Sequence, residues 1–250
     1  MSYQKCDPAI LVLEDGTVFQ GFSIGADKRA VGEVVFNTSM TGYQEIFTDP
    51  SYYGQLMVTA TAHIGNYGVH EEEVESDTVK IAGLICKKFS DIYSRPGGYA
   101  SLQEYFERDN KVVICDVDTR AVVRHIRNSG AMNAIISSEV LDIDELKAML
   151  AKVPSMDGLE LASKVSCTES YTAGEADAEH RVALLDIGVK KNIVRCLVDR
   201  GCHVKVFPMT ASFDEIKAFE PDGVMLSNGP GDPSPLTGVI ETVKQLVDAN

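Results

Sequence analysis

The residues best suited to hold a reacting substrate lie near the end of this 250-residue chain, in the run Ser227-Asn228-Gly229-Pro230-Gly231-Asp232-Pro233. The run follows an apolar stretch, 223–226, that is typical of a buried strand. Two glycines around a proline predict a sharp loop whose backbone is not shielded from a ligand by side chains. In open α/β sheets, ligands bind beyond the carboxyl ends of the strands, which is where this loop falls.

A backbone N–H at Gly229 is suited to stabilise negative charge that develops on a substrate oxygen, if the glycines allow positive φ and close approach to the substrate. The same residues are equally compatible with a plain turn between a strand and a helix, in which Asp232 shapes the loop and caps the next helix. A phosphate-binding loop of the usual kinds is excluded, because the run contains neither G-x-x-x-x-G-K-[ST] nor the third glycine of G-x-G-x-x-G.

Cysteine and histidine are the other groups that could do chemistry, and neither forms a recognisable cluster. The cysteines contain no C-x-x-C pair, so a metal site or redox motif is not predicted. Cys86 and Cys115 lie in apolar runs and are expected to be core residues. The histidines are scattered and are expected to be structural or on the surface. The cysteines are Cys6, Cys86, Cys115, Cys167, Cys196 and Cys202, and the histidines are His63, His70, His125, His180 and His203.

Composition narrows the class of protein. The net charge is −14, and an acidic surface repels phosphate backbones, which argues against nucleic-acid binding. No apolar run approaches the ~18 residues of a membrane-spanning helix, and no secretory leader is recognisable, so we expect no membrane contact and a cytoplasmic location.

The first 152 residues predict a mixed α/β N-terminal domain without strict alternation of strands and helices. Asp15-Gly16 between two apolar runs predicts a hairpin. Further strands are expected at 33–36, 55–61, 79–85, 112–115 and 134–136, and helices at 101–108, 119–128 and 144–151.

Residues 153–179 are rich in Pro, Ser, Gly and acidic residues, and are expected to form a surface linker. The pattern in 180–250 is regular, with strands at 182–185, 203–207 and 223–226 and helices at 191–200, 212–219 and 236–249. This alternation predicts a doubly wound parallel sheet. Three strands are few for such a sheet, so we expect the first half of a domain.

Six blocks along the chain resemble a known family. The loop run is similar to the oxyanion-strand motif of class I, triad-type glutamine amidotransferases. Its Asn-Gly-Pro-Gly-Asp-Pro form, together with the other blocks, resembles the small subunit of carbamoyl-phosphate synthetase. The blocks are residues 11–17, 32–52, 116–120, 186–193, 197–202 and 227–233.

The resemblance implies a function and a partner. Small subunits of this family hydrolyse glutamine to glutamate and ammonia, and the ammonia passes to a large subunit that uses ATP, Mg and bicarbonate to make carbamoyl phosphate for arginine and pyrimidine synthesis. It implies no cofactor in the small subunit itself. The expected partners are therefore glutamine and the large subunit, which we expect to contact residues 37–45, with Tyr43 as an anchor.

The resemblance also assigns site residues. Gly229 matches the glycine whose N–H helps form the oxyanion hole, and Gly231 matches its neighbour at the glutamine site. Ser51 matches a serine that reaches the bound glutamine, although the residues alone favour a turn after Pro50. The family's nucleophilic cysteine, on a Gly-x-Cys-x-Gly elbow, and its histidine and glutamate partners match no residue here, so the 250-residue polypeptide alone is expected to be inactive.

Two alternative functions remain open. One is a module that binds a partner without catalysis, which the missing nucleophile favours for the polypeptide as given. The other is the glutaminase part of a different amidotransferase, such as those of anthranilate or guanylate synthesis. The first 150 residues argue against the second alternative, because those enzymes lack them in this form.

Overall fold

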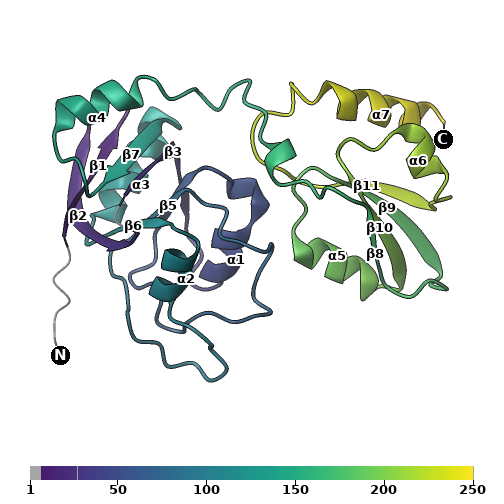
Figure 1. The fold of residues 1–250 in the computed structure, drawn as a ribbon, viewed down its shortest axis with the longest axis horizontal. Coiled ribbons are helices and arrows are strands. Elements are labelled where there is room, and N and C mark those ends of the chain that lie inside the picture. Colours follow the sequence, from purple (N-terminus) through teal and green to yellow (C-terminus); the bar gives the residue numbers. More distant parts are fainter. Residues whose placement is uncertain (1–6, 27, 250) are drawn as a thin grey trace. The chain divides into compact units, whose positions relative to one another are not determined.

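The computed structural model describes residues 7–26 and 28–249 and divides the chain into two compact units, Met1–Ser155 and Met156–Asn250 (Figure 1). Cys6 and Asn250 lie outside the described residues. Within those residues, no helix is both long and apolar enough to cross a membrane.

The first unit is built on a closed barrel with strand order β1-β2-β6-β5-β4-β3-β7. β7 closes it by pairing antiparallel with β1 and β3, and β2 pairs antiparallel with β1 and β6. The pairs β3-β4, β4-β5 and β5-β6 are parallel. The mixed α/β composition was predicted, but the closure was not. The strands are β1 Pro8–Leu13, β2 Val18–Gly25, β3 Arg29–Asn37, β4 Leu56–Thr59, β5 Gly83–Ile85, β6 Val112–Cys115 and β7 Asn133–Ser137.

Successive side chains along a strand of this barrel pack into different parts of the core. Leu11 and Leu13 of β1 join a cluster that includes residues of β3 to β7 and α3, whereas Ile10 and Val12 pack beneath α4. A third cluster places β4, β5 and β6 against Phe47 and other residues of α1 and α2. The helices are α1 Tyr43–Thr48, α2 Leu102–Arg108, α3 Thr119–Ser129 and α4 Ile143–Leu150.

Local capping explains where α2, α3 and α4 begin. Ser101 and Glu104 form a capping box at α2, and the Asp118 and Asp142 carboxylates accept backbone N–H groups at the starts of α3 and α4. Gly130, at φ 95°, ends α3 as predicted. α1 was not predicted, because six residues are too few to show a helical period.

The second unit contains a four-stranded sheet in the order β11-β9-β10-β8. β9, β10 and β11 are parallel, as the sequence predicts, and β8 adds antiparallel at the outer edge of β10. β8 belongs to the stretch 153–179 that was expected to be a linker, and residues 156–179 cluster with this unit. The strands are β8 Tyr171–Ala173, β9 His180–Asp186, β10 Cys202–Pro208 and β11 Gly223–Leu226.

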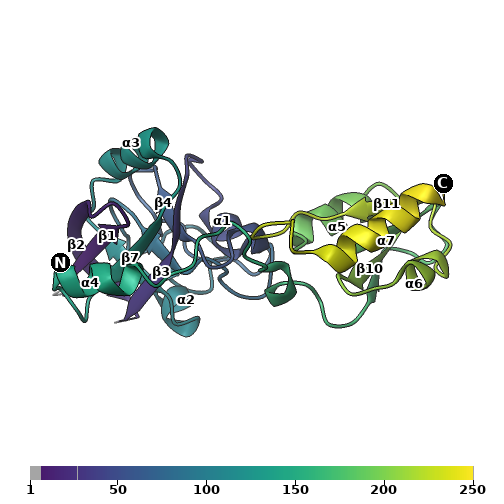
Figure 2. The same cartoon turned by 90° about the horizontal axis from the view of Figure 1, so that it is seen from above.

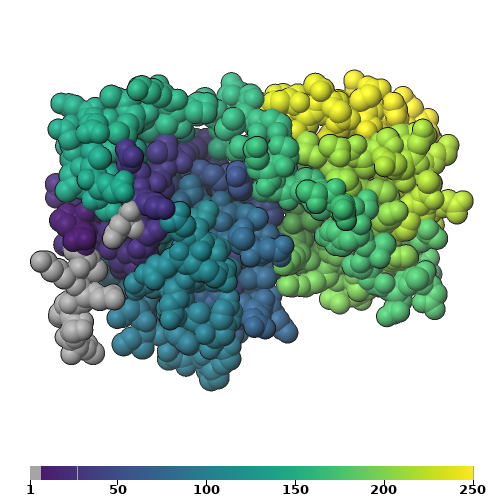
Figure 3. All heavy atoms as spheres, viewed as in Figure 1, coloured from purple at the N-terminus to yellow at the C-terminus, as the bar shows by residue number. Residues whose placement is uncertain are grey.

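Helices cover both faces of this sheet, which is the doubly wound arrangement (Figure 1; Figure 2 looks down onto α7). Leu184 of β9 packs with Val194 of α5 (Lys191–Val198). The next residue, Leu185, packs on the opposite face with residues of α6 (Phe213–Lys217) and α7 (Thr237–Asp248). The outer side of α7 forms part of the surface, where its atoms are yellow in Figure 3.

Candidate functional site: the glycine loop after β11

Two loops meet at the carboxyl ends of the neighbouring strands β9 and β11. The ladder between these strands pairs Leu226 with Leu185, and it continues with a hydrogen bond from Ser227 N–H to the Leu185 carbonyl (3.1 Å). The turn that starts at Asp186 therefore lies beside the loop that starts at Ser227. This is the edge at which a parallel sheet is expected to bind a ligand.

Gly229 passes so close to the turn after β9 that no side chain could fit there. A Cβ at position 229 would overlap the carbonyl oxygen of Ile187, and a Cβ at Gly188 would lie 2.9 Å from the Gly229 Cα. Gly229 does not have a positive φ, which corrects the expectation that it is needed for backbone freedom. The position requires glycine because of close packing between two backbones.

Position 231 requires glycine both because of its positive φ and because of close packing. Its φ is 79°, and a Cβ there would lie 2.5 Å from the Leu159 carbonyl oxygen. Gly231 also forms an isolated β-bridge with Glu160. Residues 158–160 thus press against the glycine loop from within the same unit, and no motif in the sequence pointed to them.

Asp232 reinforces this contact. Its Oδ2 accepts the Gly158 N–H and its Oδ1 accepts the Ser234 N–H, both at 2.8 Å, and these bonds lower the pKa of the carboxyl. It does not cap the following helix, because the N-cap of α7 is Leu236. Asp232 therefore shapes the loop, and the expectation that it also acts as a helix cap was wrong.

The Asp186 side chain holds the turn after β9. Only 4% of Asp186 is exposed; its Oδ1 accepts the N–H groups of Gly188 and Val189 and its Oδ2 accepts that of Cys167, each at 2.8 Å. Burial and the nearby Asp186 carboxylate raise the pKa of the Cys167 thiol to about 12. Cys167 is therefore protonated at neutral pH and poorly suited to act as a nucleophile.

Comparison with known proteins gives this geometry a context. Residues 11–136, just over half of the chain, match the family described as "Carbamoyl-phosphate synthase small chain, CPSase domain". The chain belongs to the carbamoyl-phosphate synthase small-chain family. Residues 183–250, which contain the glycine loop, match "Glutamine amidotransferase class-I".

Individual relatives agree with this assignment. The chain is 44% identical to the carbamoyl phosphate synthase small chains of Chlorobaculum tepidum and Vibrio cholerae, and covers 66% and 68% of their lengths with 97% of its own. It therefore spans about two thirds of these relatives. Among solved structures, an aminopeptidase from Aneurinibacillus sp. strain AM-1 aligns with 87% of this chain and 56% of its own at 10% identity and a TM-score of 0.32, which is too weak to support an argument.

Ser51 of this small-chain family member belongs to the first unit, and the glycine loop belongs to the second. It follows Pro50 in a short 3-10 helix, Pro50–Tyr52, and its N–H donates to Asp49 Oδ1 at 2.9 Å. The turn expected from Pro50 is present. The structure brings Gly229 and Gly231 together in one loop, and the role of Ser51 at a glutamine site stays a prediction.

Tyr43 is not an anchor for a partner, which corrects the expectation from sequence. Only 3% of it is exposed, its ring stacks on that of Tyr67 with centroids 4.0 Å apart, and its hydroxyl donates to the Gly68 carbonyl (2.6 Å). Tyr43 is a core residue at the start of α1. The exposed part of the stretch is 38–41, where Met40 is 76% exposed.

Cys86, His125 and His203 have packing or local roles. Cys86 is buried, and burial raises the pKa of its thiol. His125 pairs with Asp15 (Nε2 to Oδ2, 2.5 Å), and His203 packs edge-on against Phe219. Across residues 7–26 and 28–249, no three His, Cys, Asp or Glu side chains are grouped as metal ligands.

Proposed function

We propose that this chain serves as the glutamine-hydrolysing small chain of carbamoyl-phosphate synthase. In this proposal the loop after β11 binds glutamine, and ammonia released there is consumed by a large subunit. The family assignment supports the proposal, and so do the names of the relatives. The single structural observation that carries it is the packing of Gly229 against the Ile187 carbonyl, which requires a residue without a side chain at this point of the ligand-binding edge of the sheet.

The chemistry proposed for this loop is stabilisation of an oxyanion. When a thiolate attacks the carboxamide carbon of glutamine, the carbonyl π electrons move to the oxygen and a tetrahedral intermediate forms. A backbone N–H already aimed at that oxygen stabilises the transition state more than the ground state. We assign this donor to Gly229, and contacts to the bound glutamine to Gly231 and Ser51. The attacking cysteine and its partners match no residue of this chain, so the proposal assigns hydrolysis to the small chain as a whole and no activity to the 250-residue polypeptide alone.

The proposal assigns the remaining chemistry to the partner. We propose that the large subunit binds ATP and Mg, that this chain needs no cofactor, and that the complex works in the cytoplasm, where ATP is available. The words "small chain" in the relatives' names support a partnership with a larger chain. The first unit is the proposed contact, because no catalytic role is assigned to it beyond the proposed contact of Ser51 with glutamine.

The test replaces Gly229 with Ala in the complete small chain paired with its large subunit. The added methyl would overlap the Ile187 carbonyl and displace the donor. Since one oxyanion donor is worth ~10²–10³ in kcat, glutamine-driven synthesis of carbamoyl phosphate should fall by about that factor. Synthesis from added ammonia bypasses the site and should be nearly unchanged.

Gly238→Ala is the matched control. Gly238 lies in α7 of the same unit, and a Cβ there meets nothing within 4 Å, so both rates should stay at the wild-type level. If Gly229→Ala lowers the ammonia-driven rate as far as the glutamine-driven rate, Gly229 is only structural and the site assignment fails. If the unmodified complex assembles but never uses glutamine, the chain is a partner-binding module instead.

A further inference from the structure

Ser227 connects the two loops of the site through a single hydroxyl group. Only 6% of Ser227 is exposed. Its Oγ accepts the Ile187 N–H at 2.9 Å and donates to the carbonyl oxygen of Asn228 at 2.8 Å. The hydroxyl therefore donates its proton to one backbone group and accepts a hydrogen bond from another.

The second of these bonds acts on the peptide unit that carries the Gly229 N–H. The carbonyl of Asn228 and the N–H of Gly229 belong to the same planar group, and no cis peptide bond occurs among the described residues. In a trans peptide, C=O and N–H point in opposite directions. A hydrogen bond that holds the Asn228 oxygen towards Ser227 consequently directs the Gly229 N–H away from Ser227.

The bond from the Ile187 N–H to Ser227 restrains the backbone against which the 228–229 peptide packs. Ile187 donates its N–H to Ser227, and its carbonyl oxygen is the atom that a Cβ on Gly229 would overlap. The following N–H groups, of Gly188 and Val189, are held by the Asp186 carboxylate. Ile187 is thus restrained on both sides, and rotation of the 228–229 peptide would break the Ser227 bond.

We propose that Ser227 is a positioning residue that aims the Gly229 N–H at the developing oxyanion. The inference rests on the proposed function for the identity of the oxyanion, while the orientation of the 228–229 peptide is a property of this chain alone. Ser227 does not touch the substrate; it acts through the peptide plane. A backbone N–H whose direction is no longer fixed keeps part of its stabilising effect on the oxyanion. The expected loss of rate is therefore smaller than the loss caused by removing the donor.

The experiment compares Ser227→Ala with Ser227→Thr, which keeps the hydroxyl, in the small chain paired with its large subunit. For Ser227→Ala we expect glutamine-driven kcat to fall by roughly 10- to 100-fold, below the loss of a whole oxyanion donor. The KM for glutamine should change less than kcat, because the N–H acts mainly in the transition state. The ammonia-driven rate should stay the same, and Ser227→Thr should restore most of the kcat.

Ser212→Ala is the matched control, since Ser212 also makes side-chain bonds to backbone, at the capping box of α6 in the same unit. It should lower stability without lowering glutamine-driven kcat. The proposal is overturned if Ser212→Ala lowers this kcat as much as Ser227→Ala does, if Ser227→Thr is as impaired as Ser227→Ala, or if the ammonia-driven rate falls equally.

A measurement without turnover separates this inference from the proposed function. In the NMR spectrum of the 250-residue chain, the amide resonance of Gly229 should shift in Ser227→Ala and stay in place in Ser212→Ala. An unmoved Gly229 resonance would overturn the inference even in an active complex. If the resonance shifts but the unmodified complex cannot use glutamine, the proposed function fails and the aiming of the peptide stands.

Discussion

At the residue scale, the glycines of the loop differ in why they must be glycine. Gly229 has an ordinary φ but packs against the Ile187 carbonyl, while Gly231 has a φ of 79° and packs against the Leu159 carbonyl. A methyl group at 229 therefore acts on the proposed donor, whereas one at 231 acts on the contact with residues 158–160. The same Gly-Pro-Gly motif thus combines two physical constraints that sequence inspection does not separate.

The Gly231 contact predicts a measurable difference in stability. Gly231→Ala should lower the free energy of unfolding by more than the ~1–2 kcal/mol that left-handed backbone costs a residue with a Cβ. Gly158→Ala is the control, because Gly158 has a similar φ of 74° but a Cβ there meets nothing within 4 Å. Urea unfolding of both variants measures the difference. Equal losses would show that Leu159 moves aside without cost.

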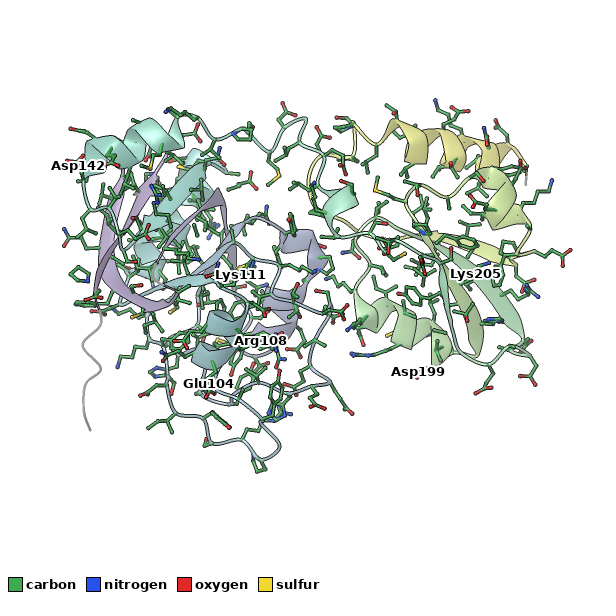
Figure 4. The ribbon with its side chains drawn as sticks, in the orientation of Figure 1. Glu104, Arg108, Lys111, Asp142, Asp199 and Lys205 are labelled. Carbon is green, nitrogen blue, oxygen red and sulfur yellow. The ribbon has the colours of Figure 1, made fainter. Side chains whose placement is uncertain are left out.

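At the element scale, one side chain joins the end of α2 to a segment that has no regular structure. Asp109 follows Arg108 (labelled in Figure 4) at the C-terminal end of α2, accepts its Nε–H at 2.8 Å, and accepts the Val79 N–H at 2.7 Å. Burial alone would raise the pKa of this carboxyl, but the bonds from Arg108 and Val79 and the Arg108 charge lower it overall. Asp109 thus anchors Val79, which is itself buried.

This lowered pKa predicts how stability depends on pH. A carboxyl whose pKa is lower in the folded state stabilises the fold above its unfolded pKa, about 3.9, and loses that contribution as the pH falls through the folded value. Asp109→Asn should therefore unfold at a lower temperature than the wild type at pH 7, with the gap narrowing below about pH 4. Thermal unfolding at a series of pH values measures this.

The exposed position Asp91 provides the control for this series. Asp91→Asn should follow the wild-type curve at every pH, because an exposed side chain contributes little to stability. A constant gap between Asp109→Asn and the wild type from pH 7 to pH 3 would contradict the assignment, since it would show that ionisation of Asp109 is not what stabilises the segment.

At the scale of the whole molecule, the two units differ in how their sheets end. The strands of the first unit close into a barrel, whereas β11 pairs with β9 alone among the strands that the structure describes. Val224 and Leu226 of β11 remain 42% and 45% exposed beside an apolar groove lined by Phe213 and Val243, among others. A strand at an unpaired sheet edge with exposed apolar side chains needs less free energy to unfold locally than a strand of a closed barrel.

Hydrogen exchange on the 250-residue chain tests this difference. Amides of Gly223–Leu226 should exchange faster than those of Leu56–Thr59, the barrel strand of equal length whose residues are all buried. Equal protection of the two strands would show that the edge of the second sheet is covered in solution, contrary to the expectation.

Local sequence determined most of the helices and strands, because their signals act within a few residues. Caps and turn residues such as Asp118 and Gly130 placed α3, and the alternation after residue 180 predicted a parallel sheet between helices. The same local reasoning identified the glycine loop, since two glycines after an apolar strand form a short pattern. It also led to the family assignment.

Only the tertiary structure decided what depends on contacts between distant residues. The barrel closes through β1 and β7, which are separated by more than a hundred residues, and β8 joins the sheet from a stretch whose composition resembles a linker. Tyr43 is buried because Tyr67 and Gly68 lie against it, and Gly229 is restricted because Ile187 passes beside it. Pairing and burial of this kind are set by packing in three dimensions, so no periodicity or local motif of the sequence could reveal them.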